Sequence, residues 1–347
     1  MRLVAVGAAA RRGWEEVLRA DDEAVVSQTP RWMDALCASS NMRDLTRLYE
    51  GQDGRRLVLP LAGRRLPPAV RPVASLPFGW SSGGLVCAAD LRVDDVRAVL
   101  TDLAALRVPR VSLRPGPGRH GVWAAAAGGR AAASAQLSQR LDLDDGFDAV
   151  SSSRFSTRVR RNARKAERAG LVVETGDAGR LVAEFDALYR ASVDRWAGHQ
   201  HEPLALARLR ARHRDPPRKF ALVAEHLGSS CRVWLARRDG VPAAAIVVLR
   251  HGRHATYWRG AMDRDVAAGT GANELLHRSA IEDACASGAR SYHMGTSAPG
   301  SSLAHFKAGF GAVEEPHASY RLERLPIDAV DRGARRVVKR VLRFRDP

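Results

Sequence analysis

Cysteine is scarce in this chain, and the few copies are dispersed. Four cysteines occur among 347 residues, and none stands in a C-x-x-C pair. A disulfide framework or a structural zinc site would need paired or regularly spaced cysteines. His199 and His201 also lack a third ligand at a characteristic spacing. We therefore expect no metal site and no bound cofactor, and a reducing compartment suits the chain.

Long hydrophobic runs are also missing. No stretch approaches the roughly 18 uncharged apolar residues of a membrane span. The N-terminal run Leu3–Ala10 is short, and Arg11, Arg12 and Glu15 stand where a signal peptide would have its cleavage region. We interpret this run as a first strand and expect a protein that stays in the cytoplasm without a transmembrane segment.

Acidic residues are outnumbered by basic ones, which gives a net charge of +17. Residues 154–168 contain seven basic residues and one acid, and residues 332–345 contain seven basic residues and no acid. Clustered charge of this kind indicates a polyanionic partner, such as RNA, nucleotide phosphates or an anionic membrane. The alternative is that the arginines decorate solvated helix faces.

Turn signals repeat along the chain. Asp53-Gly54 and Asp239-Gly240 each separate two apolar runs, a pattern that favours a β-hairpin whose two turn residues take positive φ. Each half then has a helix-period stretch, 92–106 or 271–287, followed by a short strand. The similar spacing predicts an α/β chain made of two related units, each a mixed β-sheet with flanking helices.

The units should meet where an acidic stretch gives way to three serines and the first arginine cluster. We place an N-terminal domain at residues 1–148, a catalytic domain at 149–328 and a basic amphipathic helix at 329–347. Within the catalytic domain, Ser156 should cap a basic helix that ends at Gly170. The C-terminal helix could dock on the protein core, on RNA or on a membrane surface, so peripheral membrane contact is possible.

The segment 254–311 carries the main candidate site. A strand at 254–261 leads through a glycine-containing loop into a helix that begins near Asn273. Such a loop is a natural anion site, because free N–H groups and the helix dipole face it. Lys307 follows, one of only four lysines among 55 basic residues, between Phe306 and Phe310. A compact ammonium in an aromatic setting can stabilise a developing oxyanion; the alternative is a surface lysine that lies over the aromatic rings.

At these residues the chain resembles the Fem family of aminoacyl-tRNA-dependent transferases, within the GNAT-like acyltransferase superfamily. The run Gly295–Gly300 with Phe306–Ala312 is similar to the family's G-x-S-x-x-G … F-K-x-x-[FW]-G-A signature. The stretch Arg158–Ala166 resembles the basic helix that opens the family's second domain, and Gln28–Trp32 resembles its Q-x-P-x-W. The similarity spans residues 28–325, without the coiled-coil arm of the peptidoglycan enzymes.

The resemblance implies two tandem GNAT-like domains and transfer of an aminoacyl group from tRNA to the amine of a small molecule, a peptide or a cell-wall precursor. An acyl-CoA-dependent N-acyltransferase is the alternative; its pyrophosphate loop would be Gly269-Thr270-Gly271, with Val266 where that motif has a cation and Arg264 as a substitute. A third possibility is a basic protein that binds nucleic acid or an anionic surface without catalysis. The predicted site residues are Lys307 and Ser297 for catalysis; Phe306, Phe310, Tyr257, Trp258, Arg259 and His293 for substrate binding; and Arg154, Arg158, Arg161, Arg164, Arg264, Gly269 and Gly271 for the donor and its phosphates.

Overall fold

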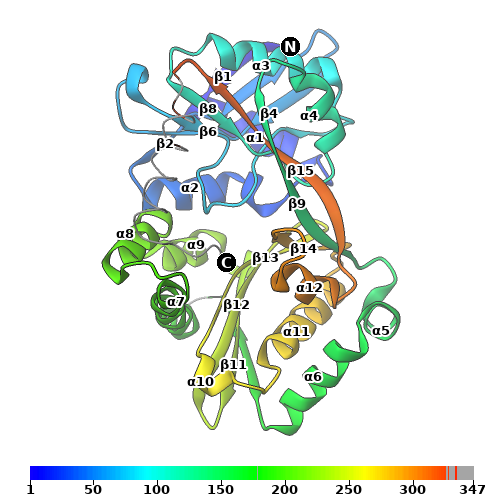
Figure 1. Cartoon of the computed structure of the whole chain (residues 1–347). Helices are drawn as coiled ribbons and strands as arrows, with labels where there is room; N and C mark the ends of the chain where they lie inside the picture. The colour runs from blue at the N-terminus through cyan, green and yellow to red at the C-terminus, as the bar shows by residue number, and fades with distance from the viewer. Residues whose placement is uncertain (178, 326, 328–332, 334–347) are drawn as a thin grey trace. The chain divides into compact units, whose positions relative to one another are not determined.

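The computed structural model describes residues 1–177, 179–325, 327 and 333 (Figure 1). The expected C-terminal helix at 329–347 therefore lies outside the described residues, apart from residue 333. The chain forms two compact units. Unit 1 comprises Met1–Gln136, Arg214–Pro217 and the segment from Pro316 onward; unit 2 comprises Leu137–His213 and Arg218–Glu315. Within the described ranges, no helix has the length and apolar character needed to cross a bilayer.

Unit 1 contains short strands and four α-helices among its described residues. Its strands are β1 (Arg2–Val6), β2 (Met42–Asp44), β3 (Arg47–Glu50), β4 (Arg56–Leu59), β5 (Ala62–Arg64), β6 (Val73–Ala74), β7 (Val86–Cys87), β8 (Arg110–Leu113) and the C-terminal part of β15 (Val313–Glu323). Its helices are α1 (Arg11–Arg19), α2 (Pro30–Ser39), α3 (Val93–Ala105) and α4 (His120–Ala127), with 3-10 turns η1 (Gly7–Ala10), η2 (Val26–Gln28) and η3 (Pro68–Val70).

The strands of unit 1 form two groups. One sheet has the order β1-β3-β4-β7, and β15-β8-β6-β5-β2 form the other run of paired strands. The apolar core joins strand residues such as Leu57 and Leu113 to Val99 of α3 and Trp123 of α4. The predicted hairpin around Asp53-Gly54 is present as β3 and β4, but its connection is a five-residue loop at 51–55 rather than a two-residue turn.

Unit 2 carries the longer elements. Its strands are the part of β9 (Ala132–Asp142) from Leu137 on, β10 (Val172–Gly176), β11 (Cys231–Arg238), β12 (Val241–His251), β13 (His254–Met262) and β14 (Ser291–Thr296). Its helices are α5 (Gly146–Ala149), the π-helical turn η4 (Val150–Arg154), α6 (Thr157–Arg168), α7 (Arg180–His199), α8 (Leu204–Arg214), α9 (Lys219–Leu227), the 3-10 turn η5 (Gly228–Ser230), α10 (Arg264–Ala267), α11 (Ala272–Ala286) and α12 (Ser302–Ala308).

The sheet of unit 2 has the strand order β10-β11-β12-β13-β14-β9. The predicted hairpin at Asp239-Gly240 is confirmed: Arg238 pairs with Val241, and the two turn residues have φ values of 50° and 79°. Since Asp and Gly tolerate this left-handed region, the two-residue turn fits the right-handed twist of β11 and β12. The meander of β11, β12 and β13 forms the long central part of the unit (Figure 1).

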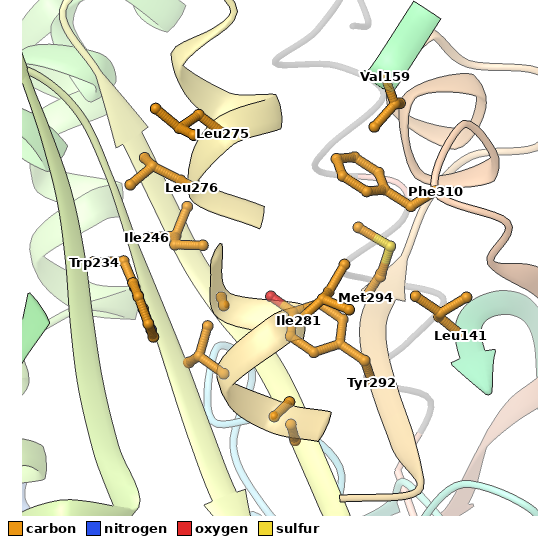
Figure 2. Packing of buried hydrophobic residues seen from close by; sticks show 14 of the residues in the cluster. Leu141, Val159, Trp234, Ile246, Leu275, Leu276, Ile281, Tyr292, Met294 and Phe310 are labelled. Atoms are coloured by element: carbon orange, nitrogen blue, oxygen red, sulfur yellow. The ribbon is translucent and has the colours of Figure 1, made fainter. Parts of the chain in front are cut away.

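Helices α6 and α11 pack against each other beside this sheet. The predicted N-cap of α6 is confirmed, because the Ser156 hydroxyl accepts a hydrogen bond from the Val159 N–H. The predicted buried face of α11 is also confirmed, with Leu276 and Ile281 in the core against Ile246 of β12. On the opposite side from Ile246, the core contains Tyr292 and Met294 of β14 and also Phe310, which lies beside Val159 (Figure 2).

Candidate active site

The site begins where strands β13 and β14 stop pairing. The two strands run parallel, with His254 to Thr256 opposite Ser291 to His293. Beyond that register β13 pairs with β12, and β14 pairs with β9 as far as Thr296. The end of β14 is thus free of β13, and the chain continues from it into the loop 297–301 and helix α12. This arrangement places Lys307 of α12 next to the last carbonyl groups of β14.

Lys307 lies at this point with its side chain buried. Its Nζ donates hydrogen bonds to the carbonyl oxygens of Gly295, at 3.1 Å, and Thr296, at 3.0 Å. An ammonium group has three N–H donors, and the third has no hydrogen-bond partner among the described residues. Burial lowers the pKa of Lys307 to about 8. The group is therefore mostly protonated near neutral pH, with one N–H that has no partner among the described residues.

Ser297 and Gln139 form a hydrogen-bonded link beside Lys307. The Ser297 hydroxyl donates to the Gln139 Oε1 at 2.9 Å, and the Gln139 Nε2 donates to the carbonyl oxygen of Ala304 at 3.0 Å. Gln139 is buried on β9 and so joins the loop after β14 to helix α12. Because the Ser297 hydroxyl hydrogen is engaged, this geometry suits a positioning role for Ser297 in the state described. Sequence reasoning missed Gln139, which carries no local motif.

An aromatic cluster lies near Lys307, whose charge acts on the histidine at its centre. Its centre is His277 of α11, whose ring lies 5.5 Å from Phe306, 5.4 Å from Phe310 and 4.6 Å from Tyr257 between centroids. Burial, helped by the nearby Lys307 charge, lowers the pKa of His277 to about 3. His277 is therefore a neutral imidazole, and the hydroxyl of Tyr292 lies 3.3 Å from its Nδ1. Phe306, Phe310 and Tyr257 thus lie around His277, close to Lys307.

Trp258 packs away from this cluster, whereas the positive charge of Arg259 acts on Tyr257 and opposes the rise in its pKa that burial causes. The Trp258 ring packs on Phe220 of α9 at 5.5 Å between centroids, and the Lys219 Nζ lies 5.3 Å from it. The Arg259 guanidinium lies over the same indole at 5.1 Å. Neighbouring residues of a strand point to opposite faces, so Tyr257 reaches the Lys307 side while Trp258 reaches α9. The structure therefore divides the predicted substrate-binding set between two faces of the sheet.

His293 also has different neighbours from those of Lys307. Its Nε2 lies 2.9 Å from Nδ1 of His254, and the two rings are stacked. Burial, followed by the charge effects of His254 and Arg140, lowers the pKa of His293 to about 3. Tyr292, next along β14, points into the core instead. The structure places His293 in a buried histidine pair on the far face of β14.

The loop before α11 holds the two predicted phosphate-binding glycines, and their surroundings differ. At Gly271, with φ +80°, a Cβ would come within 2.3 Å of the Asn162 carbonyl oxygen on α6, so this glycine allows α6 and α11 to pack closely. At Gly269, with φ +64°, the nearest group to a Cβ would be the Lys165 Nζ at 3.9 Å. Only Gly269 therefore leaves room for an anion, and Lys165 is a cation beside it.

Three of the four predicted arginines share one exposed stripe of α6. Arg158, Arg161 and Arg164 are exposed, and no acid pairs with their side chains in the part of the chain that the structure describes. Arg154 differs, because its guanidinium donates to the carbonyl oxygen of Asp142 and pairs with Asp145. Arg264 lies apart from this stripe, with its NH1 3.0 Å from the His199 Nε2.

Part of the chain matches a known protein family, and the whole chain is similar to several solved structures. Residues 153–308 match the family described as "Acetyltransferase (GNAT) domain". The structure of FemX is similar over 93% of this chain and 97% of its own, with a TM-score of 0.62 and 11% identity. L-PGS from Bacillus licheniformis is similar over 92% of this chain and 94% of its own, with a TM-score of 0.53 and 12% identity.

A further solved structure is the C-terminal domain of a putative lysylphosphatidylglycerol synthetase from Agrobacterium fabrum. It is similar over 89% of this chain and 92% of its own, with a TM-score of 0.52 and 15% identity. No curated protein matches the sequence significantly. At these identities the structures show the fold alone. The fold is GNAT-like, as the sequence predicted, and the chain is an acyltransferase whose GNAT domain contains Lys307.

Proposed function

We propose that this acyltransferase moves an aminoacyl group from aminoacyl-tRNA to the amine of a small molecule or a peptide. The observation that carries the proposal is the exposed stripe of α6, formed by Arg158, Arg161 and Arg164. The same helix brings Lys165 to Gly269, at the loop before α11. These basic side chains have no acidic partner among the described residues. They extend along α6 to the N-terminus of α11, the helix that carries His277 of the aromatic cluster.

A long polyanion suits this surface better than a single small phosphate compound. Arg158, Arg161 and Arg164 recur every three residues along α6, so their guanidinium groups follow the helix over two turns. Several phosphates in a row can contact such a stripe, and each contact releases counterions into solution. One pyrophosphate would engage Gly269 and Lys165 and leave the rest of the stripe without a partner.

The chemistry assigned to Lys307 is electrostatic. The acceptor amine attacks the ester carbonyl carbon, the new C–N bond forms, and the C–O bond to the terminal ribose of tRNA breaks. The carbonyl oxygen becomes negative in between, and the third N–H of Lys307 stabilises it. The amine loses one proton, and the departing ribose oxygen gains one. Phe306, Phe310 and Tyr257 keep water from the ammonium, which strengthens its interaction with the oxyanion.

The experiment is the salt dependence of aminoacyl-tRNA binding. We expect log Kd to rise steeply with log salt concentration for the wild type. The triple variant Arg158→Gln, Arg161→Gln, Arg164→Gln should bind more weakly, with a slope lower by about 2 to 3, because each lost phosphate contact removes nearly one unit. The matched control changes Arg2, Arg19 and Arg107 of unit 1, which are exposed and equally charged. If the control lowers the slope as much as the α6 variant, general charge rather than the stripe binds RNA.

Transfer from acyl-CoA is the second candidate, and Gly269 favours it. This glycine precedes α11, where N–H groups and the helix dipole favour an anion, and the Lys165 Nζ supplies a cation. Two residues argue against it. Val266 supplies no charge where the CoA-binding motif has a cation, and Arg264, the possible substitute, contacts His199. The two candidates separate in the α6 triple variant: it should retain full affinity for acetyl-CoA if CoA is the donor, because its substitutions leave Gly269 and Lys165 unchanged.

A further inference from the structure

A second polar cluster lies in unit 1, on the strand pair β8 and β15. The two strands are antiparallel, with Tyr320 opposite Leu113 and Arg321 opposite Ser112. Leu113 and Tyr320 point into the apolar core of the unit. Because side chains alternate across a strand, Arg114 and Ser319 point to the other face, and continuation of the register sets them opposite each other. His317 lies two residues from Ser319 and so shares that face.

Arg114 is the cation of this cluster. Its guanidinium lies 5.2 Å from the centroid of the Phe78 ring, and Phe78 is 70% exposed. Its side chain donates only a long hydrogen bond, 3.4 Å, to the carbonyl oxygen of Pro77. Among the described residues no carboxylate pairs with it. Burial and the charge of Arg321 both lower the pKa of Arg114, so the group is desolvated and close to another cation.

Two buried polar atoms in this part of unit 1 have no hydrogen-bond partner. These are Oγ of Ser319, a residue that is 8% exposed, and Nδ1 of His120 at the start of α4. Burial lowers the pKa of His317, and the charges of His120 and Arg114 lower it further, so both groups lie within electrostatic range of His317. A buried polar atom without a partner costs about 1–3 kcal/mol. Such a cluster is stabilised when an acceptor with negative charge binds.

Asp21 lies next to Arg119, the residue before His120, and is already paired. Asp21 accepts two hydrogen bonds from Arg119, both at 2.9 Å, and also accepts the Cys87 N–H. Its charge is therefore matched by Arg119, which precedes His120 in the sequence. The positive charge of Arg114 therefore has no carboxylate partner among the unit 1 side chains that the structure describes.

We propose that Arg114, Ser319, His120 and His317 form an oxyanion site in unit 1 that binds the phosphate group of a ligand. The groups come from three parts of unit 1: Arg114 follows β8, His317 and Ser319 lie on β15, and His120 begins α4. Arg114 contributes a planar fork of N–H donors suited to phosphate oxygens. Exposed Phe78 offers an aromatic face next to the bound group, which suits a phosphate carried on a planar ring.

The secondary structure around this site resembles that around Lys307. Helix α4 follows β8 in unit 1 as α12 follows β14 in unit 2. The sequence of α4, His-Gly-Val-Trp-Ala-Ala-Ala-Ala, contains no lysine. Unit 1 therefore lacks a counterpart of the buried ammonium, and binding rather than acyl transfer is the role that its cluster supports.

The test is binding of inorganic phosphate and of adenosine 5′-monophosphate to the full chain, measured by calorimetry at constant ionic strength. We expect saturable binding of phosphate at one site and a lower Kd for the nucleotide if Phe78 stacks on its base. Arg114→Gln should raise the phosphate Kd at least tenfold. Ser319→Ala should raise it severalfold while the melting temperature stays the same or increases, because the substitution removes a hydroxyl without a partner.

Arg107→Gln is the matched control, since Arg107 is an exposed arginine of unit 1 outside the cluster. The proposal is overturned if phosphate does not bind at one saturable site. It is also overturned if Arg107→Gln weakens binding as much as Arg114→Gln does. Should Arg114→Gln fail to fold, an unchanged phosphate Kd in Ser319→Ala would be enough to reject the site. No arm uses tRNA, so the result is independent of the donor proposed above.

Discussion

Lys307 combines two properties that oppose each other. Its burial disfavours the charged form and lowers its pKa to about 8, while two carbonyl oxygens accept hydrogen bonds from it and so favour the ammonium. The result is a cation in a dry setting whose position is fixed by the backbone of β14. A side chain of this kind needs no reorganisation when negative charge develops nearby.

We predict that Lys307→Ala lowers kcat about 10²–10³-fold with a smaller change in KM, as removal of one oxyanion donor does in other enzymes. Lys307→Arg should not restore the rate, because a planar guanidinium cannot place its donors as an ammonium does. Steady-state kinetics on both variants provide the measurement. Full activity in Lys307→Ala would remove this residue from the chemistry.

The pKa of Lys307 also predicts a pH profile. If the ammonium is the active form, log(kcat/KM), calculated on the concentration of unprotonated acceptor amine, is flat below pH 8 and falls with a slope near −1 above it. The pH-rate profile of the wild type measures this limb. A rate that rises through pH 8 would mean that the neutral amine acts, as a base, and would contradict the electrostatic role.

The pKa of His277 predicts how the free energy of unfolding changes at acid pH. Its pKa is about 3 in the folded chain and 6.5 in an unfolded one, so below pH 6.5 the unfolded state binds more protons. The free energy of unfolding should therefore decrease as the pH falls from 6.5 towards 3. In His277→Gln the decrease should be smaller, as measured by denaturant unfolding at pH 7 and pH 5. An equal decrease in both proteins would show that His277 does not titrate on unfolding.

At the scale of elements, the two glycines before α11 form a matched pair. Both have positive φ, so alanine strains the backbone similarly at either position. Only at Gly271 would the new Cβ meet backbone, the Asn162 carbonyl oxygen of α6. We predict that Gly271→Ala lowers the free energy of unfolding by about 1–3 kcal/mol more than Gly269→Ala does. Urea denaturation of the two variants decides this, and equal losses would show that α6 and α11 need not approach so closely.

Local sequence signals predicted the elements well where one chemical requirement decides the structure. Asp239-Gly240 can adopt the turn of a tight hairpin, and Ser156 can cap α6, so both features appear as expected. The pair Asp53-Gly54 has the same letters, yet the chain forms a five-residue loop there. The turn residues permit a tight hairpin, but the register of β3 and β4 decides the loop length.

At the scale of the whole molecule, the sequence indicated the GNAT-like fold, Lys307 and its aromatic neighbours, because these lie in one short stretch. It did not indicate Gln139 or His277, which come from β9 and α11 and meet Lys307 only through the topology of unit 2. It also grouped His293 with the site because of its position in the chain. Strand alternation sends that side chain to the far face of β14.

The donor is the central claim, and the most direct measurement is a comparison of aminoacyl-tRNA and acetyl-CoA binding to the wild-type chain across a salt series. The proposal predicts tight, steeply salt-dependent binding of charged tRNA and no saturable binding of acetyl-CoA. Saturable binding of acetyl-CoA together with weak, unsaturable binding of tRNA would contradict it, and would make the chain an acyl-CoA-dependent transferase whose α6 arginines are surface charge.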